Sequence, residues 1–509
     1  MRVGSFTNMV LGETMTTIPI LSSLIGLNFV GAASALIWRK NAYIIGVVIS
    51  LFSFVMSWDL FNYFDPSKVT YQFQESYQWL PFIHSKIQLG VDGIAVAMIV
   101  LTAFTTLLVL CMTRYLVSIK LPLYTAMFLL LQAAMIGIFS ALDGVLFYLF
   151  WETTLIPMVV CIGVWGSGKR CFAATKFFLY TFLGSTLLLM SIIYLGWQAH
   201  SYAFSDWVGL NLSVPVQVTL FLGCLVAFAI KIPMWPLHTW LPDAHTEAPT
   251  AGSVLLAALL LKVGAFGLLR FNIAMFPKAS AIMAWPMIIL SLIAIVSVGL
   301  IALAQTDLKR LIAYSSVAHM GFVTLGIFSV FIIYPVAGIK ASVLAFEGAL
   351  VQMIAHAFGS GAMFLAFGLL YHQTHTREIN HLGGVASVMP YFSAFFILFC
   401  LSNIGVPGTV GFVGEFTVIL GVASGNFAVA ACAALSLIIG AMYTLWMVRR
   451  VFFGPVESAV VKPLEDIGVV ERTTLGILVM VIIFYGVYPS PIFKLIHPTA
   501  ESLVKMVNR

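Results

Sequence analysis

Charged side chains are scarce in this chain of 509 residues: 25 Lys and Arg and 19 Asp and Glu together make up 9%. Soluble domains contain about 25% charged residues. Apolar and aromatic residues (AVILMFWYC) instead reach 61%. This composition excludes a soluble enzyme, a disordered chain and a nucleic-acid-binding protein. It indicates a polytopic helical membrane protein, because each bilayer span needs about 20 apolar residues.

Cysteine is also sparse, with six residues that lie almost entirely in apolar stretches and form no CxxC pair. Such cysteines act as small hydrophobic residues in helix packing, so we expect neither a metal site nor a disulfide. The first 17 residues (MRVGSFTNMVLGETMTT) contain too few apolar residues for a secretory signal peptide, and we assign them no role.

Long apolar runs fill the rest of the sequence. A window of about 19 residues predicts an all-α membrane protein with about 14 transmembrane helices, near 18–38, 42–61, 93–113, 121–141, 144–165, 172–197, 217–240, 251–271, 281–304, 311–334, 343–370, 388–420, 425–448 and 473–490. The polar stretch 62–91 contains the alternating sequence SKVTYQFQESYQWLPF. This alternation predicts a short hairpin outside the membrane.

The positive charges of the loops predict the orientation. Loops that follow odd-numbered spans carry 13 Lys and Arg, whereas those that follow even-numbered spans carry 5. Cytoplasmic loops are enriched in Lys and Arg. The odd loops are therefore expected in the cytoplasm, and both termini on the opposite, external face.

Two predicted spans are interrupted. The seventh (FAIKIPMWPLHTWLP) contains Pro233 and Pro236, and the twelfth (SNIGVPGTVGFVGEF) contains Pro407 among four glycines. Proline inside a helix removes a backbone donor and breaks the helix. The breaks recur five spans apart, and this odd offset predicts two inverted five-helix repeats, spans 4–8 and 9–13. Paired discontinuous helices in inverted repeats point to the ion path of a transporter.

The predicted organisation has no domains of the soluble kind. We expect an N-terminal segment (1–17), spans 1–3 with the external loop 62–91 (18–116), a first, proton-conducting inverted repeat of spans 4–8 (117–275), a second inverted repeat of spans 9–13 (276–453), and a final loop with span 14 (454–509).

Several ionisable residues lie well inside spans, where a charge costs about 2.5–3.5 kcal/mol on insertion scales. We interpret them as a relay of protonatable groups at the membrane midplane, because a carboxylate that moves relative to a lysine changes the lysine's affinity for its proton. The relay residues are Glu152, Lys231, Lys262, His319, His356 and Glu415. Lys176 and Glu347 lie nearer span ends, where snorkelling to the interface explains them.

Two histidines in the loop after the seventh span, His238 and His245, are candidates for the cytoplasmic proton entry. The alternatives are structural. Glu152 and Lys231 would form a static ion pair, although a buried pair is weak evidence of net stabilisation. A lone histidine between helices is commonly a hydrogen-bonded packing residue.

Two further patterns do not point to sites. GVWGSGKR (163–170) has Arg170 in place of the Ser or Thr of a nucleotide-binding loop, and it follows a membrane helix rather than a strand. His372, His375 and His381 have no cysteine or acidic cluster to complete a zinc site.

Four stretches carry a resemblance to a known family: FYLFWETTLIPM (147–158), KIPMWPLHTWLPDAHTEAPTAGSVLLAALLLKVGAFGLLR (231–270), AQTDLKRLIAYSSVAHMGF (304–322) and GVPGTVGFVGEF (405–416). With them the sequence resembles, over nearly its whole length, the antiporter-like proton-pumping membrane subunits of respiratory NADH:quinone oxidoreductase (complex I). These subunits are similar to the large subunits of multisubunit sodium/proton antiporters.

Within the family the sequence is most like subunit 4, the M-type chain. Glu415 matches the glutamate of subunit 4 at a position where the sister subunits carry lysine. The chain also ends after one further span, whereas the largest sister continues into a long lateral helix. The sequences FWETTLIPM and HTREINHLGG (375–384) agree with this assignment.

The resemblance implies a multi-pass subunit in the bacterial inner membrane, or alternatively the mitochondrial one, that shares in redox-driven proton pumping. Flavin, iron–sulfur clusters and quinone (ubiquinone) are expected in partner subunits, and no cofactor, metal or redox centre in this chain. The expected partners are the other membrane subunits of complex I, including the sister antiporter-like subunits, and the lipid bilayer.

The implied relay passes cytoplasmic protons from Lys231 through Lys262 and the central histidines to Glu415, for release on the far side. Glu152 sets the charge state of Lys231. One alternative is a subunit of a sodium/proton antiporter or of a membrane-bound hydrogenase, which neighbouring genes for flavin and iron–sulfur subunits would exclude. Another is a non-conducting spacer, which tolerance of substitutions at the four intramembrane charges would favour.

Overall fold

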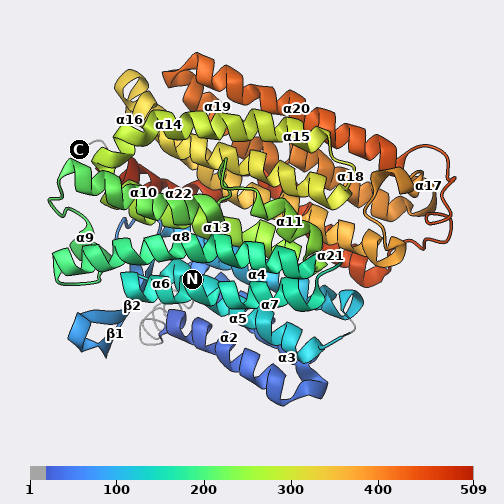
Figure 1. Cartoon of the computed structure of the whole chain (residues 1–509), viewed down its shortest axis with the longest axis horizontal. Helices are drawn as coiled ribbons and strands as arrows, with labels where there is room; N and C mark the ends of the chain where they lie inside the picture. The colour runs from blue at the N-terminus through green and yellow to red at the C-terminus, as the bar shows by residue number, and fades with distance from the viewer. Residues whose placement is uncertain (1–18, 118, 508–509) are drawn as a thin grey trace, which may run out of the picture. The chain divides into compact units, whose positions relative to one another are not determined.

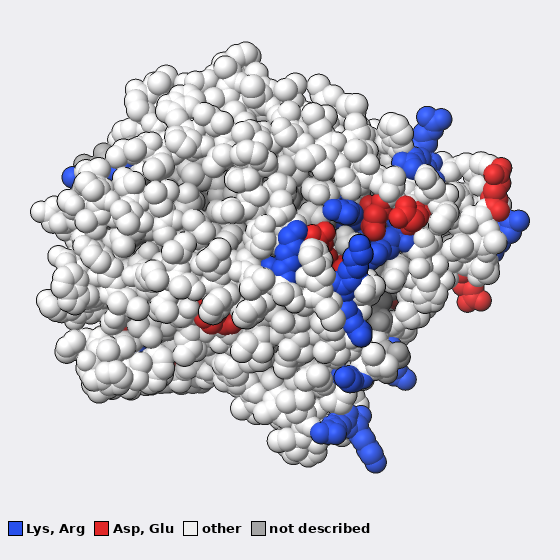
Figure 2. All heavy atoms as spheres, viewed as in Figure 1, with Lys and Arg blue, Asp and Glu red and all other residues white. Residues whose placement is uncertain are grey.

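The computed structural model describes residues 19–117 and 119–507, so the predicted segment 1–17 lies outside the described residues. Within them, 12 helices are long and apolar enough to cross a membrane. Most of the surface visible in Figure 2 carries no Lys, Arg, Asp or Glu. Large apolar side chains such as Ile37, Leu183 and Met480 are exposed, as expected of helices that face lipid. The prediction of an all-α polytopic membrane protein is confirmed.

The chain packs as two compact units. The first contains the described residues of Met1–Cys111, Ser118–Met158 and Leu189–Asn211. Its elements are α2 (Ile20–Ile37), η1 (Arg39–Asn41), α3 (Ala42–Tyr63), β1 (Gln72–Leu80), η2 (Pro81–Ile83), β2 (Ser85–Val91), most of α4 (Gly93–Leu116), α5 (Leu121–Ser140), α6 (Gly144–Thr153), the start of α7 (Leu155–Trp165), the end of α8 (Arg170–Ala199) and α9 (Phe204–Trp207).

The strands β1 and β2 form the predicted hairpin, as an antiparallel pair in which Ser76 lies opposite Gln88. The carboxylate of Glu75 accepts hydrogen bonds from the backbone N–H groups of Leu21 (2.8 Å) and Ser22 at the start of α2. This contact satisfies two of the donors that a helix leaves unpaired at its N-terminus. In the same unit, Asp143 caps α6 by accepting from Val145 and Leu146.

The second unit contains Met112–Val117, Val159–Leu188 and the described residues of Leu212–Arg509. Its further elements are α10 (Val214–Lys231), α11 (Trp240–Glu247), α12 (Thr250–Leu255), η3 (Leu256–Leu260), α13 (Leu261–Gly267), η4 (Leu268–Ile273), α14 (Pro277–Ile293), η5 (Ala294–Val298), α15 (Gly299–Leu303), α16 (Leu308–Thr374), η6 (Ile379–His381), α17 (Val385–Val388), α18 (Pro390–Ile404), α19 (Val410–Gly425), α20 (Phe427–Phe452), α21 (Val469–Val487) and α22 (Ser490–Val507). In this unit α14 and α15 lie against α16, and α15 also lies against α20 (Figure 1).

Both predicted helix breaks are present. In the seventh span, α10 ends at Lys231 and α11 begins only at Trp240. In the twelfth, α18 ends at Ile404 and α19 begins at Val410, with Gly405 between them at a φ of 80°. Lys231 therefore lies at a helix end, and Glu415 lies within the first two turns of α19.

The predicted tenth and eleventh spans are joined in the single 67-residue element α16. Gly338 divides it, with a φ of 73°, a conformation that glycine adopts without steric cost. The boundary between the two spans therefore requires no polar loop. The total of 14 spans and the inverted repeats stay predictions.

The helix that carries Lys262 is irregular. Two π-helical segments, η3 and η4, lie immediately before and after the seven-residue α13. All residues from Ala251 to Ile273 are buried. Short π segments inside α-helices are frequently found at functional sites, and here they flank an ionisable residue.

Candidate functional site

The most enclosed charge in the second unit is Lys262, whose exposed fraction is 0%. Its Nζ donates to the carbonyl oxygen of Ala257 in η3 at 2.6 Å and lies 2.6 Å from Nδ1 of His356 on α16. A lysine ammonium has only donors, so the imidazole must accept through an unprotonated Nδ1. The two predicted residues are thus joined by one hydrogen bond.

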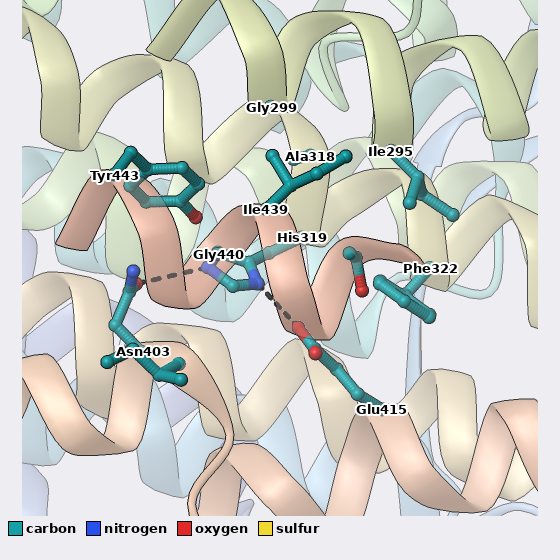
Figure 3. A pocket seen from close by; sticks show the side chains of 12 residues that line it. Ile295, Gly299, Ala318, His319, Phe322, Asn403, Glu415, Ile439, Gly440 and Tyr443 are labelled. Carbon is teal, nitrogen blue, oxygen red and sulfur yellow. Dashed lines mark hydrogen bonds and ion pairs between the residues drawn. The ribbon is translucent and has the colours of Figure 1, made fainter. Parts of the chain in front are cut away.

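A second pair lies next to the first. Nδ1 of His319 is 2.6 Å from Oε1 of Glu415, which is 3% exposed, and Nε2 of His319 is 3.1 Å from Oδ1 of Asn403 on α18. Figure 3 shows the imidazole held between these two side chains. The amide of Gln352 also donates to Glu415 at 3.1 Å.

The two pairs face each other. The rings of His319 and His356 have centroids 5.8 Å apart. A small space of about 10 Å³, about the volume that one water needs, borders His319, His356 and Glu415. Nε2 of His356 and Oγ of Ser402 border the same space, and neither has a hydrogen-bond partner within residues 19–117 and 119–507. A water there would connect the two pairs.

Lys231 lies at the end of α10, with an exposed fraction of 2%. Its stem packs against α13: a Cβ built on Gly264 would lie 2.8 Å from Cβ of Lys231. The break that follows is closed by Trp240, whose indole N–H donates to the carbonyl of Ile230 at 2.9 Å. The two lysines of the predicted relay therefore lie on packed helices, with Gly264 two residues after Lys262.

Glu152 belongs to the first unit, near the end of α6. Its Oε1 is buried and has no hydrogen-bond partner among the described residues. Lys231 belongs to the second unit. The predicted pairing of Glu152 with Lys231 stays a prediction.

The histidines after the seventh span are both buried, on either side of the start of α11. Within the described chain, neither ring nitrogen of His245 has a hydrogen-bond partner, and the same holds for Nδ1 of His238. The His245 ring stacks on Phe364 of α16 at 4.4 Å with an interplanar angle of 5°. His245 is thus a buried imidazole with both nitrogens available.

A charged cluster that the sequence did not reveal lies beside His245. Lys309 is buried and donates to the carbonyl of Ala248, and Arg377 lies 3.2 Å from Asp307 and 3.7 Å from Glu247. Burial raises the pKa of Asp307 at the start of α16, although the backbone N–H of Arg310 and the charge of Arg377 oppose this shift. Two cations and two carboxylates thus meet in one place.

These charges border a cavity of about 190 Å³, which is large enough for several water molecules. Its lining includes Glu247, Lys309, His372, His375 and Arg377. Two of the three histidines that matched no zinc pattern, His372 and His375, therefore border this cavity. His245 directly precedes the lining residues Thr246 and Glu247, so it lies next to the wall of this cavity.

Comparison with known proteins identifies the family. A sequence model described as "NADH:quinone oxidoreductase/Mrp antiporter, TM" matches residues 141–440. NADH-quinone oxidoreductase subunit M of Rhodobacter capsulatus is 44% identical over 481 residues, which cover 92% of this chain and 91% of that protein. The chain belongs to the subunit M family of NADH-quinone oxidoreductase.

A further relative and a solved structure agree with this assignment. NADH-ubiquinone oxidoreductase chain 4 of Marchantia polymorpha is 38% identical, covering 95% of this chain and 97% of that one. A chain of respiratory complex I from Thermus thermophilus superposes with a TM-score of 0.86 at 28% identity, covering 96% of this chain and all of that chain. The predicted resemblance to the antiporter-like subunit 4, or chain M, is confirmed, and the chain is a multi-pass protein of the inner membrane.

In this subunit M family member, three polar residues of the site were missed by sequence reasoning. Asn403 and Gln352 bind the His319–Glu415 pair directly, and Tyr443 of α20 lines the adjoining space of about 10 Å³ with His319 and Glu415. Each is an uncharged polar residue inside an apolar run, a pattern that is more often helix packing than a site. Only the fold brings them to the ionisable residues.

Proposed function

We propose that this chain translocates protons across the inner membrane as an antiporter-like subunit of NADH:quinone oxidoreductase. NADH-to-quinone electron transfer takes place in other subunits, which hold the flavin, iron–sulfur clusters and quinone. The partners are the remaining membrane subunits of the complex, including its sister antiporter-like subunits. The relay consists of Glu152, Lys231, Lys262, the central histidines and Glu415.

The observation that supports the relay most is the chain of contacts from Lys262 through His356 and His319 to Glu415. Charged groups inside a membrane are costly and mark ion or proton pathways. Here an ammonium and a carboxylate stand at the two ends of a buried row of two imidazoles. Imidazole both accepts and donates protons near neutral pH, so this row can pass a proton between its charged ends.

Proton entry is assigned to the cavity bordered by Glu247 and Lys309. By the loop charges, the segments that line it are predicted to be cytoplasmic. His245 next to it has two available ring nitrogens, and His238 lies in the break just before α11. Protons from the cytoplasm pass by these histidines to Lys231 and Lys262, continue to Glu415, and leave on the external face.

The pairing of Glu152 with Lys231 controls when the lysine releases its proton. When Glu152 approaches Lys231, the lysine holds its proton more tightly, and when Glu152 withdraws, the proton moves on. Moving one charge against 100 mV requires about 2.3 kcal/mol, which the redox reaction in the partner subunits supplies. The broken helices provide the flexible, water-accessible backbone that membrane interiors tolerate only around such paths.

The test uses the intact complex with Lys231→Ala in this chain. Lys278→Ala is the matched control, because Lys278 is an exposed residue. The proposal expects the Lys231 variant to assemble but to lose most NADH-driven proton translocation, while the control pumps normally. Normal pumping by the Lys231 variant would overturn the relay.

Co-purification decides the redox assignment. The tagged chain, extracted in mild detergent, is expected to bring with it NADH:quinone reductase activity together with flavin and iron–sulfur signals. A particle that lacks NADH chemistry would instead favour the sodium/proton antiporter or the membrane-bound hydrogenase.

A further inference from the structure

The last helix, α22, was not among the predicted spans, and its sequence is amphipathic. Leu495, Ile496 and Val504 are buried, whereas Lys494, His497 and Lys505 are exposed. α22 packs along α16, the element that also carries His319, Gln352 and His356. One face of α22 therefore packs against the relay helix, and its other face is exposed.

One polar contact links the two helices. Nδ1 of His497 lies 2.6 Å from Oε1 of Glu347 on α16. The side chain of Glu347 is 9% exposed, whereas that of His497 is 54% exposed. A buried carboxylate is thus hydrogen-bonded to an imidazole that reaches solvent.

Glu347 lies close to Glu415 when positions are compared along the axes of the packed helices α16 and α19. Cβ atoms built on Gly348 and Gly414 would lie 2.6 Å from the backbone N of Val418 and 2.8 Å from Cα of Gln352, so α16 and α19 touch at these levels. Glu415 is therefore level with the residue before Gln352. Four residues of α-helix, about 6 Å, separate that level from Glu347.

The direction of this offset is outward. α16 continues from Gly338 toward the segment that the loop charges predict to be cytoplasmic, so its lower numbers lie toward the external face. α22 follows α21 at the end of the chain, which the same rule predicts to be external. Glu347 and His497 thus lie between the end of the buried relay and the predicted external solution.

The surroundings contain few other charges. Glu501 of α22 is the further acidic group that acts on Glu347, and Glu501 is bound by Lys505 at 2.8 Å. Toward the relay, Gln352 donates to Glu415, and its own Oε1 has no partner among the described residues. Gln352 lines the space of about 10 Å³ that also borders Glu415, so it extends from that space toward the level of Glu347 one turn away.

We propose that Glu347 and His497 form the proton-release pair of this subunit, an inference that rests on the proposed function. Protonated Glu347 transfers its proton to the unprotonated Nδ1 of His497, and the proton on Nε2 leaves to external water. The remaining carboxylate then accepts the next proton from the side of Glu415, and the imidazole returns to its first tautomer through water. One proton enters, one leaves, and no electron is transferred.

A purely structural contact is the competing explanation. Ion pairs that involve exposed groups contribute about 0–1 kcal/mol, so the contact adds little to the docking of α22. An imidazole changes charge near neutral pH, which suits release to the external solution. The two roles differ in whether a small diffusible base can replace the side chain.

The test measures the initial rate at which the intact complex builds up a membrane potential in sealed vesicles during NADH oxidation. The membrane potential is chosen because a weak base such as imidazole collapses a pH gradient but not a potential. His497→Ala is compared with Lys494→Ala, an exposed residue on the same helix. We expect His497→Ala to lower the initial rate of potential formation about tenfold, less than the roughly 100-fold or more that positioned proton-transfer groups contribute, because the exposed position also admits water. Imidazole added on the external side should restore most of it.

Glu347→Gln should cause a similar loss that imidazole does not restore, because the carboxyl acts before the histidine. An unchanged rate in His497→Ala overturns the proposal. A lowered rate without rescue also overturns it, in favour of a structural contact. Lys262→Ala is measured alongside: if it pumps normally, the relay itself fails, whereas its loss with normal pumping by His497→Ala rejects the release pair alone.

Discussion

Lys262 and His356 are joined by a 2.6 Å hydrogen bond in a place where neither side chain is exposed to solvent. Two positive charges at this distance repel strongly in a medium of low dielectric constant. The pair therefore holds at most one excess proton at a time, on the ammonium or on the imidazole. When His356 accepts the proton at Nδ1, it can release one from Nε2 into the space that it shares with His319.

Substitutions at His356 separate the hydrogen bond from proton transfer. His356→Asn keeps an oxygen acceptor for Lys262, so the thermal stability of the complex should change little. His356→Ala leaves a buried donor with one partner fewer, which costs about 1–3 kcal/mol. Both should lose most NADH-driven proton translocation, measured in vesicles, because neither side chain transfers protons. Wild-type pumping by His356→Asn would show that protons take another route.

Glu415 is expected to act through its charge. Glu415→Gln preserves the shape of the side chain and can still bind His319 and Gln352, so assembly should be retained. Proton translocation should fall by about 100-fold, within the range that positioned acid–base groups contribute. The matched control is Glu465→Gln, an exposed residue. Equal pumping by the two variants would remove Glu415 from the relay.

Gly264 tests the spacing of the two lysines without altering a charge. In Gly264→Ala the new methyl group would meet Cβ of Lys231 at 2.8 Å and the backbone N of Ile232 at 2.9 Å. Overpacking of this kind costs about 1–3 kcal/mol and pushes α10 away from α13. We expect reduced proton translocation at unchanged subunit content. Gly26→Ala, at a site where nothing lies within 4 Å, should pump normally.

Asp307 gives a pH dependence outside the spans. Because burial raises its pKa above the ordinary value of 3.8, the folded state binds the proton more tightly than the unfolded state. The stability from this carboxyl is therefore full at low pH and falls as pH rises through its folded pKa. The midpoint of thermal unfolding of the wild type, relative to Asp307→Asn, should decrease as pH rises above the ordinary carboxyl pKa of 3.8. A constant difference would contradict the raised pKa.

The sequence predicted those features that local chemistry determines. Prolines and glycines marked both helix breaks, and alternation marked the hairpin of β1 and β2. The cost of charge in lipid identified Lys262 and Glu415. The helix α22 was missed because a search for continuous apolar runs passes over a helix that is polar on one face.

Side-chain pairings were not accessible from one sequence. The bond between Lys262 and His356 joins residues 94 positions apart, and the contact of Arg377 with Ser167 joins residues 210 apart. Glu347 was interpreted as a snorkelling residue, but its carboxylate is buried and bonded to His497. Such contacts depend on how helices pack, and hydropathy does not encode which faces meet.

The two π segments beside Lys262 have a mechanical consequence. A π turn contains about one residue more than an α turn, and this surplus can migrate along a helix without moving the ends. Each residue that it passes rotates by about 100° and advances by about 1.5 Å. With η3 ending at Leu260 and η4 beginning at Leu268, α13 can rotate within fixed flanks. Such a rotation would carry the ammonium of Lys262 away from His356 and toward a different neighbour, so the relay could be opened by a helix that stays anchored at both ends.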